Sequence, residues 1–518
     1  MLNIIWIIVD SVRNYSCAAE RFDDRGRLDI MDDLAADWVD FRTVVTSAPS
    51  TLMSMGSMFT GWPAYHLGSA FDGLRISECG LPTICSCLKP FGYHSYCITH
   101  YTWGRECWGQ IFDPLPKRLW AKGLTHRNEW TNAETNRALF HFLDNLACEP
   151  MFLFLHYNCR GDPRISHHVR MCIESLKDRG HFERSIIFLT SDHGYPDPLR
   201  REEVARRRKE IGLRADEVSH DLLMTDDNIL VPLLVKYPGC SSMRIEQQIC
   251  TLDYLPTSME LAGLRFTENV AGLSVVPLLR GEDMPQLKDR KVRIDGRFMA
   301  QTGRVTALRS PSRKYIVYPD RPETSREEFY DIEKDPQEVQ DLVLTGTGGY
   351  EIELEEFRQV YQLDQERARE FQKQSLGGKY RRQMEARLGG RMSQIKRILY
   401  VRSGRPEFDD MAASIFGDVF PLADLVSVDR ARVLNAANAR FDLVHAGITS
   451  NFGISPLLKG IGSLGARHKL MMNLAMELVA FSRFEEILAF RGLWLKREWY
   501  YQEPMYFFRE VWRKLRGH

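Results

Sequence analysis

The chain lacks a net charge, a long apolar run and a paired pattern of cysteines, and each absence excludes a class of protein. Lysine plus arginine and aspartate plus glutamate number 69 each, so the overall charge gives no argument for a nucleic-acid partner, and we expect none. No run approaches the roughly 20 apolar residues that a membrane span needs. The composition, 44% apolar and 27% charged, is typical of a globular protein, and the length favours two domains.

The cysteines give no sign of disulfide or zinc chemistry. They number 11, an odd count, and the one-residue gap between Cys85 and Cys87 is unlike zinc-finger or thioredoxin motifs. Reduced thiols in a cytoplasmic protein fit this pattern. The apolar Met1–Asp10 lacks a basic region and a small-residue cleavage site, so we expect a first buried strand there and not a signal peptide.

What the sequence does contain is two apolar segments that end in metal-binding side chains. Asn3–Val9 predicts a buried strand, and Asp10 follows it; Ser185–Leu189 predicts another, and Thr190–Gly194 follows with Asp192 and His193 inside it. The carboxyl ends of strands in open α/β sheets are where ligands bind. Carboxylate oxygens and an imidazole nitrogen there can bind one divalent cation. A capping aspartate and a structural Asp-His pair are the alternatives.

A hydroxyl-rich segment, Val45–Gly61, predicts a short helix with Ser50 or Thr51 at its N-cap. The backbone N–H groups at a helix N-terminus attract anions and stabilise an alkoxide. A hydroxyl placed there is therefore either a nucleophile or a plain cap.

Taken in order, these segments resemble the sulfatase branch of the alkaline phosphatase superfamily. The resemblance covers roughly residues 1–345 and rests on a series of motifs, namely Asn3–Asp10, Thr51–Gly61, Ser191–Gly194, Leu230–Gly239, Thr251–Thr257 with Leu261–Leu264, Gly272–Gly281, Arg313–Tyr315 and Phe329–Pro336. It implies an α/β fold, namely an alkaline-phosphatase-like three-layer domain with a large mixed sheet. It also implies metal-dependent hydrolysis or transfer of phosphate or sulfate esters.

The sequence departs from this family at its nucleophile. The family motif C/S-x-P-S-R, whose first residue becomes a formylglycine, places Thr51 at the nucleophile and Met55 at the arginine. A rival frame starts at Ser47 but also lacks the arginine. Threonine is not converted to formylglycine in this family, so we expect none. Thr51 resembles the branch that cleaves or transfers phosphoryl groups.

The resemblance implies a centre in which Asp10, Asp192 and His193 hold a divalent ion that binds and activates Thr51. A threonine hydroxyl is a weak nucleophile until a cation or a base lowers its pKa. Its alkoxide would attack the ester and give a covalent intermediate. The ligand set does not separate manganese, zinc, magnesium and calcium, and leaves a second ion open. Ser11 stands where some sulfatases carry a second acid.

Four more residues are site candidates on this resemblance. His100 takes the place of a substrate-binding lysine, and His156, at the end of a predicted strand, is a catalytic candidate. Arg160 would clamp an anionic oxygen. His220 would donate a proton to the leaving oxygen or bind a second metal. The alternatives are structural histidines and a solvated loop arginine.

We predict three parts of the chain: a catalytic domain at 1–345, a charged helical connector at 346–392 and a small α/β domain at 393–518. Strands are expected in the last part at 395–401, 441–447 and 468–473, and the loop at 447–453 is a weak ligand-loop candidate. The aromatic and basic tail predicts either docked helices or peripheral membrane contact.

The sequence thus supports two hypotheses. The first is an enzyme acting on an anionic ester, glycan- or lipid-linked, in the cytoplasm or at a membrane surface. The second is a degenerate sulfatase-like module that binds an anionic glycan or a partner without catalysis. The oligomeric state is left open.

Overall fold

The computed structural model describes residues 1–14, 28–67, 76, 81–100, 108, 111–114, 131–158, 162–196, 222–297, 304–319, 327–346, 348–402, 406–428, 441–447, 466–472 and 478–480. These residues belong to two compact units, the first reaching to Leu363 and the second running from Asp364 onward. The division falls inside the predicted connector. The predicted domain limits at 345 and 392 stay predictions. No helix in the described ranges is long and apolar enough to cross a membrane.

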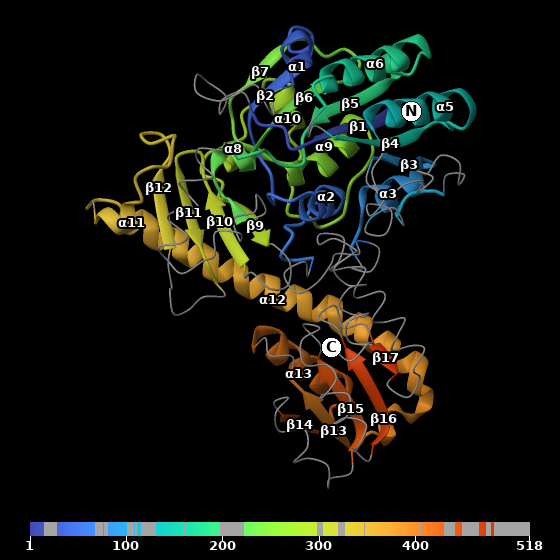
Figure 1. Ribbon diagram of the computed structural model, residues 1–518, viewed down its shortest axis with the longest axis vertical. Coiled ribbons are helices and arrows are strands. Elements are labelled where there is room, and N and C mark those ends of the chain that lie inside the picture. The colour runs from blue at the N-terminus through green and yellow to red at the C-terminus, as the bar shows by residue number, and fades with distance from the viewer. Residues whose placement is uncertain are drawn as a thin grey trace, which may run out of the picture. The chain divides into compact units, whose positions relative to one another are not determined.

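The first unit is built on a mixed, eight-stranded sheet (Figure 1). Its strands in spatial order are β3 (His94–Thr99), β4 (Met151–Asn158), β1 (Asn3–Asp10), β5 (Ser185–Thr190), β6 (Leu230–Lys236), β2 (Val39–Val45) and β7 (Met243–Ile245), with β8 (Ile249–Cys250) also paired to β2. Every residue of β1 is buried. A strand covered on both faces needs a continuous apolar run, and the predicted strands at β1 and β5 are confirmed.

Strand direction brings the carboxyl ends of three strands to one edge. Strand β1 pairs in parallel with β4 and with β5, whereas β6 runs antiparallel to β5 and β2. The register opposes Asp10 to Asn158 on β4 and Ile8 to Thr190 on β5. The residues that follow β1, β4 and β5 therefore meet at the same edge of the sheet.

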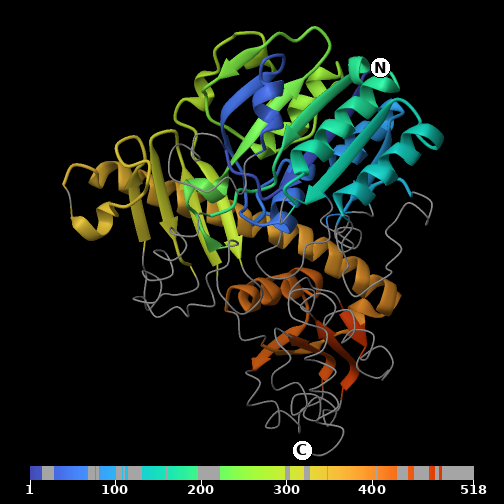
Figure 2. The same cartoon turned by 45° about the horizontal axis from the view of Figure 1, so that its top comes forward.

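Alternation along β1 divides its side chains between two cores, which makes the unit three-layered. Ile4, Trp6 and Ile8 pack with α2 (Thr51–Thr60) and α9 (Tyr254–Leu261), whereas Ile5, Ile7 and Val9 pack with α5 (Asn132–Asn145) and α6 (Ile165–Asp178). Figure 2 shows α5 and α6 together on their side of the sheet. The remaining helices of the layers are α1 (Ile30–Leu34), α3 (Ile84–Leu88) and α10 (Val276–Leu279), with short 3₁₀ turns at Lys89–Phe91, Phe182–Arg184, Thr251–Asp253 and Pro285–Leu287.

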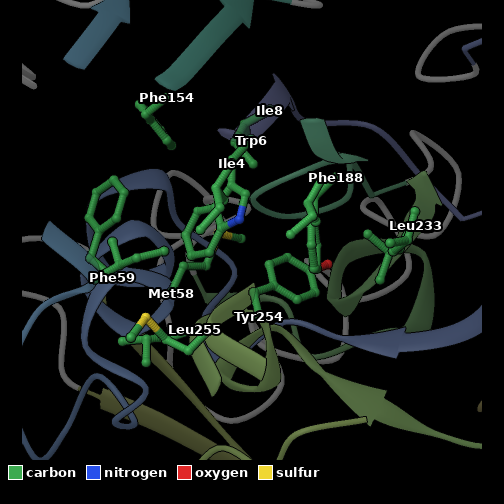
Figure 3. Close-up of a cluster of buried hydrophobic side chains, with 14 of the residues drawn as sticks. Ile4, Trp6, Ile8, Met58, Phe59, Phe154, Phe188, Leu233, Tyr254 and Leu255 are labelled. Atoms are coloured by element: carbon green, nitrogen blue, oxygen red, sulfur yellow. The ribbon is translucent and has the colours of Figure 1, made fainter. Parts of the chain in front are cut away.

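Trp6 lies at the centre of the first of these cores (Figure 3). Its ring stacks on Phe59 with centroids 6.2 Å apart and meets Tyr254 edge-on at 6.0 Å. Its indole N–H donates to Ser258 Oγ at 3.1 Å. The one polar atom of this large buried ring is thereby satisfied, as burial requires.

A second sheet, antiparallel and four-stranded, completes the first unit. It consists of β9 (Val292–Arg297), β10 (Arg304–Arg309), β11 (Arg313–Val317) and β12 (Glu327–Asp331). The short helix α8 (Asp226–Ile229) is tied to this sheet because Arg309 on β10 makes a bidentate ion pair with Asp226. Helix α11 (Leu342–Thr345) follows, and the long α12 (Glu351–Leu388) begins by packing Phe357 against Tyr315 and Phe329.

The second unit contains a five-stranded sheet, parallel except at one edge. Its order is β14 (Asp424–Val428), β13 (Arg397–Val401), β15 (Phe441–Gly447), β16 (Ala466–Met472) and the antiparallel β17 (Leu478–Ala480), with helix α13 (Pro406–Val419) and a 3₁₀ turn at Gly389–Gln394. The three strands expected here are present, whereas β14 and β17 were not predicted. The aromatic and basic tail lies outside the described residues.

Candidate metal centre

Asp10, Asp192 and His193 meet at the shared edge of the sheet. Each offers one ligand atom, these atoms lie within 4.8 Å of one another, and all three residues are buried. His193 Nε2 is 3.6 Å from Asp10 Oδ1 and 3.5 Å from Asp192 Oδ2. Such distances are too long for hydrogen bonds. They suit three ligands of one ion, because atoms about 2.1 Å from a tetrahedral metal lie roughly 3.4 Å apart.

The tautomer of His193 leaves its other nitrogen facing the carboxylates. His193 Nδ1 is 2.7 Å from the carbonyl oxygen of Gly194, which only accepts, so Nδ1 carries the proton. In the neutral ring, Nε2 then carries a lone pair that is directed at two carboxylate oxygens. With His193 in this form, three electron-rich atoms face one another, and a cation between them would offset their repulsion.

The carboxylate of Asp192 supports the same conclusion. Its Oδ1 accepts the backbone N–H of Ser11 at 3.1 Å, whereas its Oδ2 is buried and has no hydrogen-bond partner. Burial raises the pKa of Asp192, the adjacent His193 opposes that rise, and the charge of Asp10 adds to it. A buried carboxylate oxygen without a partner is costly. A bound divalent ion would satisfy it, so the residues present fit a metal.

Thr51 lies beside the three candidate ligands. It is the first residue of α2, which follows Ser50 as N-cap, and Thr51 Oγ1 is 3.3 Å from His193 Nε2. Thr51 is 8% exposed, whereas Asp192 and His193 are 0% exposed. The predicted helix is confirmed, and its N-terminus presents the hydroxyl and its free N–H groups to the centre.

Hydroxyl groups that sequence reasoning missed hold the loop after β5. Thr46 Oγ1 and Ser54 Oγ each donate to the carbonyl oxygen of Asp192 at 2.7 Å. Ser191 Oγ accepts the N–H of Val12 at 2.9 Å and lies 2.6 Å from the carbonyl oxygen of Val9. Their sequence signal was limited to small hydroxyl residues in the Val45–Gly61 segment and shortly after the strand predicted at Ser185–Leu189. These bonds fix the backbone that carries Asp192 and His193.

Gly194 ends this loop where a side chain would not fit. Its N–H donates to the carbonyl oxygen of Asn228 at 2.8 Å. A Cβ at position 194 would lie 2.2 Å from the carbonyl oxygen of Asp227. The glycine after the Asp-His pair is therefore required by the close approach of α8.

His100 and His156 form a buried pair near the centre. Their ring centroids are 4.6 Å apart, and His100 Nδ1 is 3.1 Å from the carbonyl oxygen of His156. Burial lowers the pKa of His100 to about 4, and the negative charge of Asp10 partly offsets this. Burial, followed by the neighbouring His100, also lowers the pKa of His156. Both rings are thus neutral near pH 7, and the N–H of His100 lies on Nδ1, which leaves its Nε2 as an acceptor.

The other two candidates cannot be placed. Arg160 and His220 lie outside the described residues. Their roles stay predictions.

Comparison with known proteins finds sulfatases among the sequence matches. Residues 220–363 match the family model described as "N-sulphoglucosamine sulphohydrolase, C-terminal". Arylsulfatase K of Gallus gallus is 26% identical over 178 residues, which cover 33% of this chain and 30% of that protein. Delta 4,5-hexuronate-2-O-sulfatase of Bacteroides thetaiotaomicron is 27% identical over 196 residues, 36% of each chain. Parts of this chain are thus similar in sequence to sulfatases.

Solved structures extend this sulfatase relationship to the fold. The alignment with the structure of BT4656 in complex with its substrate D-glucosamine-2-N,6-O-disulfate covers 71% of this chain and 98% of that chain. Its TM-score is 0.55, and the sequences are 13% identical. The phosphonate monoester hydrolase of Agrobacterium radiobacter covers 71% and 96%, with a TM-score of 0.52 and 14% identity. The predicted mixed α/β fold is confirmed.

The sequence relationship to sulfatases is partial in extent. The matched segments span about a third of the length of the two curated relatives named above. The predicted resemblance to the sulfatase family is confirmed. The threonine-nucleophile variant within it is a finer hypothesis.

Proposed function

We propose that this protein is a metal-dependent hydrolase or transferase of phosphate or sulfate esters, with Thr51 as its nucleophile. The observation that carries the proposal is the convergence of Asp10, Asp192 and His193 on one point beside the Thr51 hydroxyl. A buried cation site next to a hydroxyl at a helix N-terminus is suited to attack on an anionic ester.

The residues divide the chemistry among them. Asp10, Asp192 and His193 would hold a divalent ion, and that ion would supply the Lewis acidity to lower the pKa of the Thr51 hydroxyl and offset charge on the ester. Thr51 Oγ1 attacks the phosphorus or sulfur, the bond to the leaving oxygen breaks, and an ester of Thr51 forms. Water or an acceptor hydroxyl then cleaves that ester. The N–H groups at the start of α2 stabilise the anionic oxygens.

Further roles follow for the histidines and for Arg160. His100 would bind substrate through Nε2, which accepts hydrogen bonds because Nδ1–H donates to the carbonyl oxygen of His156, and His156 would assist the chemical step. His220 would protonate the leaving oxygen, and Arg160 would bind an anionic oxygen. Zinc, manganese, magnesium and calcium all remain candidates for the ion, and we expect no formylglycine at Thr51.

The relatives guide the choice of substrate. The hexuronate sulfatase and the glucosamine-disulfate complex are named for sulfated sugars, and one structural neighbour for phosphonate monoesters. We infer an anionic ester, glycan- or lipid-linked, as substrate. We favour phosphoryl over sulfuryl transfer because Thr51 offers a hydroxyl rather than an aldehyde hydrate.

The test is a substrate and metal profile of the purified protein. Turnover of p-nitrophenyl phosphate, bis-p-nitrophenyl phosphate and p-nitrophenyl sulfate is measured with added manganese, zinc, magnesium or calcium. We expect the wild-type protein to cleave phosphate esters. Thr51→Ala should abolish this activity, and Ser47→Ala should retain it. Rapid sulfate cleavage with silent phosphates would reverse the preference for phosphoryl groups. Full activity of Thr51→Ala would move the nucleophile elsewhere.

A second candidate function is a degenerate module that binds an anionic glycan or a partner. Met55 and Ser11, at positions where the resemblance leads us to expect an arginine and an acid, favour it. Metal analysis separates the two functions, because a protein that retains no divalent ion even after soaking would support the binding module. The cytoplasmic location and the membrane contact of the tail stay predictions, the latter to be tested by liposome flotation of intact and tail-deleted protein.

A further inference from the structure

Ser11 has a backbone conformation that its side chain disfavours. It follows Asp10 at the tip of β1, is 2% exposed, and has a φ of 63°. Only Glu338 shares a positive φ among the described residues other than glycine. A side chain in this left-handed region costs free energy that glycine avoids. A serine here therefore needs an interaction that glycine lacks.

That interaction is a pair of hydrogen bonds to both carboxylates of the centre. Ser11 Oγ donates to Asp10 Oδ1 at 2.6 Å, and the Ser11 N–H donates to Asp192 Oδ1 at 3.1 Å. The left-handed turn lets one residue direct its hydroxyl and its N–H at two acids that are 182 positions apart in the chain, Asp10 and Asp192. Asp192 Oδ2, the oxygen turned toward His193, remains for an ion.

The two bonds address the main electrostatic difficulty of the centre. Two buried carboxylates repel each other, and each can turn away about its side-chain torsions. Donors outside the ligand set orient ligands and keep them ionised, and such donors contribute strongly to metal affinity. The hydroxyl hydrogen of Ser11 is committed to Asp10, and this bond orients that carboxylate.

We propose that Ser11 is a positioning residue of the metal centre, orienting Asp10 through its hydroxyl and Asp192 through its backbone N–H. This inference rests on the proposed function. It assigns Ser11 a role that differs from a metal ligand and from a simple turn residue.

The deciding variant is Ser11→Gly, which keeps the turn and the N–H but removes the hydroxyl. Calorimetric titration of metal-free protein with Mn²⁺ and Zn²⁺ should give an affinity about tenfold or more below wild type. The melting temperature of the metal-free variant should equal or exceed that of wild type, because glycine removes the backbone cost. Opposite directions for metal affinity and stability are not expected of a merely structural serine.

Two further variants complete the test. Ser11→Ala removes the hydroxyl but keeps the free-energy cost of the left-handed backbone conformation. Its metal affinity should fall as in Ser11→Gly, and its metal-free form should melt at a lower temperature than wild type. Ser185→Ala is the matched control, because Ser185 is a buried serine whose Oγ donates to the carbonyl oxygen of His181 at 2.6 Å, at the other end of β5. It should lose stability and keep wild-type metal affinity.

The outcomes separate this inference from the function beneath it. If the wild-type protein binds metal tightly and Ser11→Gly binds it equally well, the proposed role of Ser11 is wrong and the metal centre is still supported. A wild-type protein that binds neither ion overturns the centre and the inference together. Reduced affinity in both Ser11 variants, with the Ser185 control unchanged, supports the inference.

Discussion

At the scale of single residues, this protein places charge where burial alone would exclude it. Asp10 is 1% exposed and Asp192 is 0% exposed, and His193 Nε2 lies 3.6 Å and 3.5 Å from their carboxylate oxygens. Burying an ionised carboxylate without a compensating charge is strongly unfavourable. On the proposed function, the centre would lower the stability of the metal-free protein and gain affinity for a cation in return, and its variants should show both effects.

Asp192→Asn tests the trade directly. Asparagine has nearly the same shape but removes the charge, so metal affinity measured by titration calorimetry should fall by more than about 100-fold. Because burial raises the pKa of Asp192, its ionised form destabilises the metal-free protein at neutral pH, and the variant should melt at a higher temperature without metal. Asp144→Asn, at an exposed pair with Arg179, is the control and should leave metal affinity unchanged. Unaltered binding by Asp192→Asn would remove Asp192 from the ligand set.

Gly194→Ala tests the packing of the loop that carries His193. The new Cβ would lie 2.2 Å from the carbonyl oxygen of Asp227 and 3.0 Å from the Cα of Asn228, and these backbone atoms cannot move as a side chain could. We expect a loss of about 1–3 kcal/mol in the free energy of unfolding, measured by urea denaturation, together with weaker metal binding. Gly417→Ala in α13 has open space around it and should gain about 0.5–1 kcal/mol. A neutral Gly194→Ala would show that the loop can move away from α8.

At the scale of elements, the approach of β1, β5, α2 and α8 to one edge creates the site, and other contacts hold those elements. The bidentate pair of Arg309 with Asp226 joins the second sheet to α8, which in turn supports Gly194. Helix α12 is held on the second sheet by Phe357 and by the ion pair of Arg358 with Glu327 on β12. Apolar packing supplies most of that contact, and the ion pair makes it sensitive to pH.

Glu327→Gln should show that pH dependence. The hydrogen bond from Arg358 lowers the pKa of Glu327, and partial burial opposes it. A lowered pKa in the folded state adds stability above the unfolded value of about 4.3, and this stability is lost as pH falls through the folded value. The variant should therefore be less stable than wild type at pH 7, and the difference should shrink below about pH 4 in urea denaturation. A double-mutant cycle with Arg358→Met measures the coupling free energy between Glu327 and Arg358. The same coupling at pH 7 and below about pH 4 would contradict this pH dependence.

At the scale of the whole molecule, the chain has two units with separate cores. All four groups of the candidate centre, Asp10, Thr51, Asp192 and His193, belong to the first unit. The second unit packs Tyr380 of α12 against Phe416 of α13 and has its own sheet. A ligand that binds only one unit should raise the unfolding temperature of that unit and leave that of the other unchanged.

Removal of metal should therefore lower only one transition in scanning calorimetry. Saturation at 100 times the dissociation constant is worth about 2.7 kcal/mol, so chelation should shift the first unit's transition to lower temperature. Tyr380→Ala, in the core of the second unit, identifies the other transition by lowering it. A chelator that moves both transitions equally, or neither, would contradict this assignment.

The amino-acid sequence by itself determined the strands β1 and β5 and the helix at Thr51. It also identified Asp10, Asp192 and His193 as side chains expected to meet at one edge of the sheet. This was possible because burial on both faces requires unbroken apolar runs, and parallel strands bring their carboxyl ends to one edge. It did not predict β14 or β17, which are five and three residues long. Short strands carry too little pattern to be distinguished from loops.

The tertiary structure alone decided what holds the centre in place. Ser11 and Asp192 are 181 positions apart, and Ser54 and Asp192 are 138 apart. No local pattern relates such residues, because hydrogen bonds between them depend on how distant segments pack. The left-handed turn at Ser11 and the close approach that requires Gly194 are likewise properties of the folded chain. Local periodicity thus specified which atoms can bind an ion, and long-range packing specified how they are oriented.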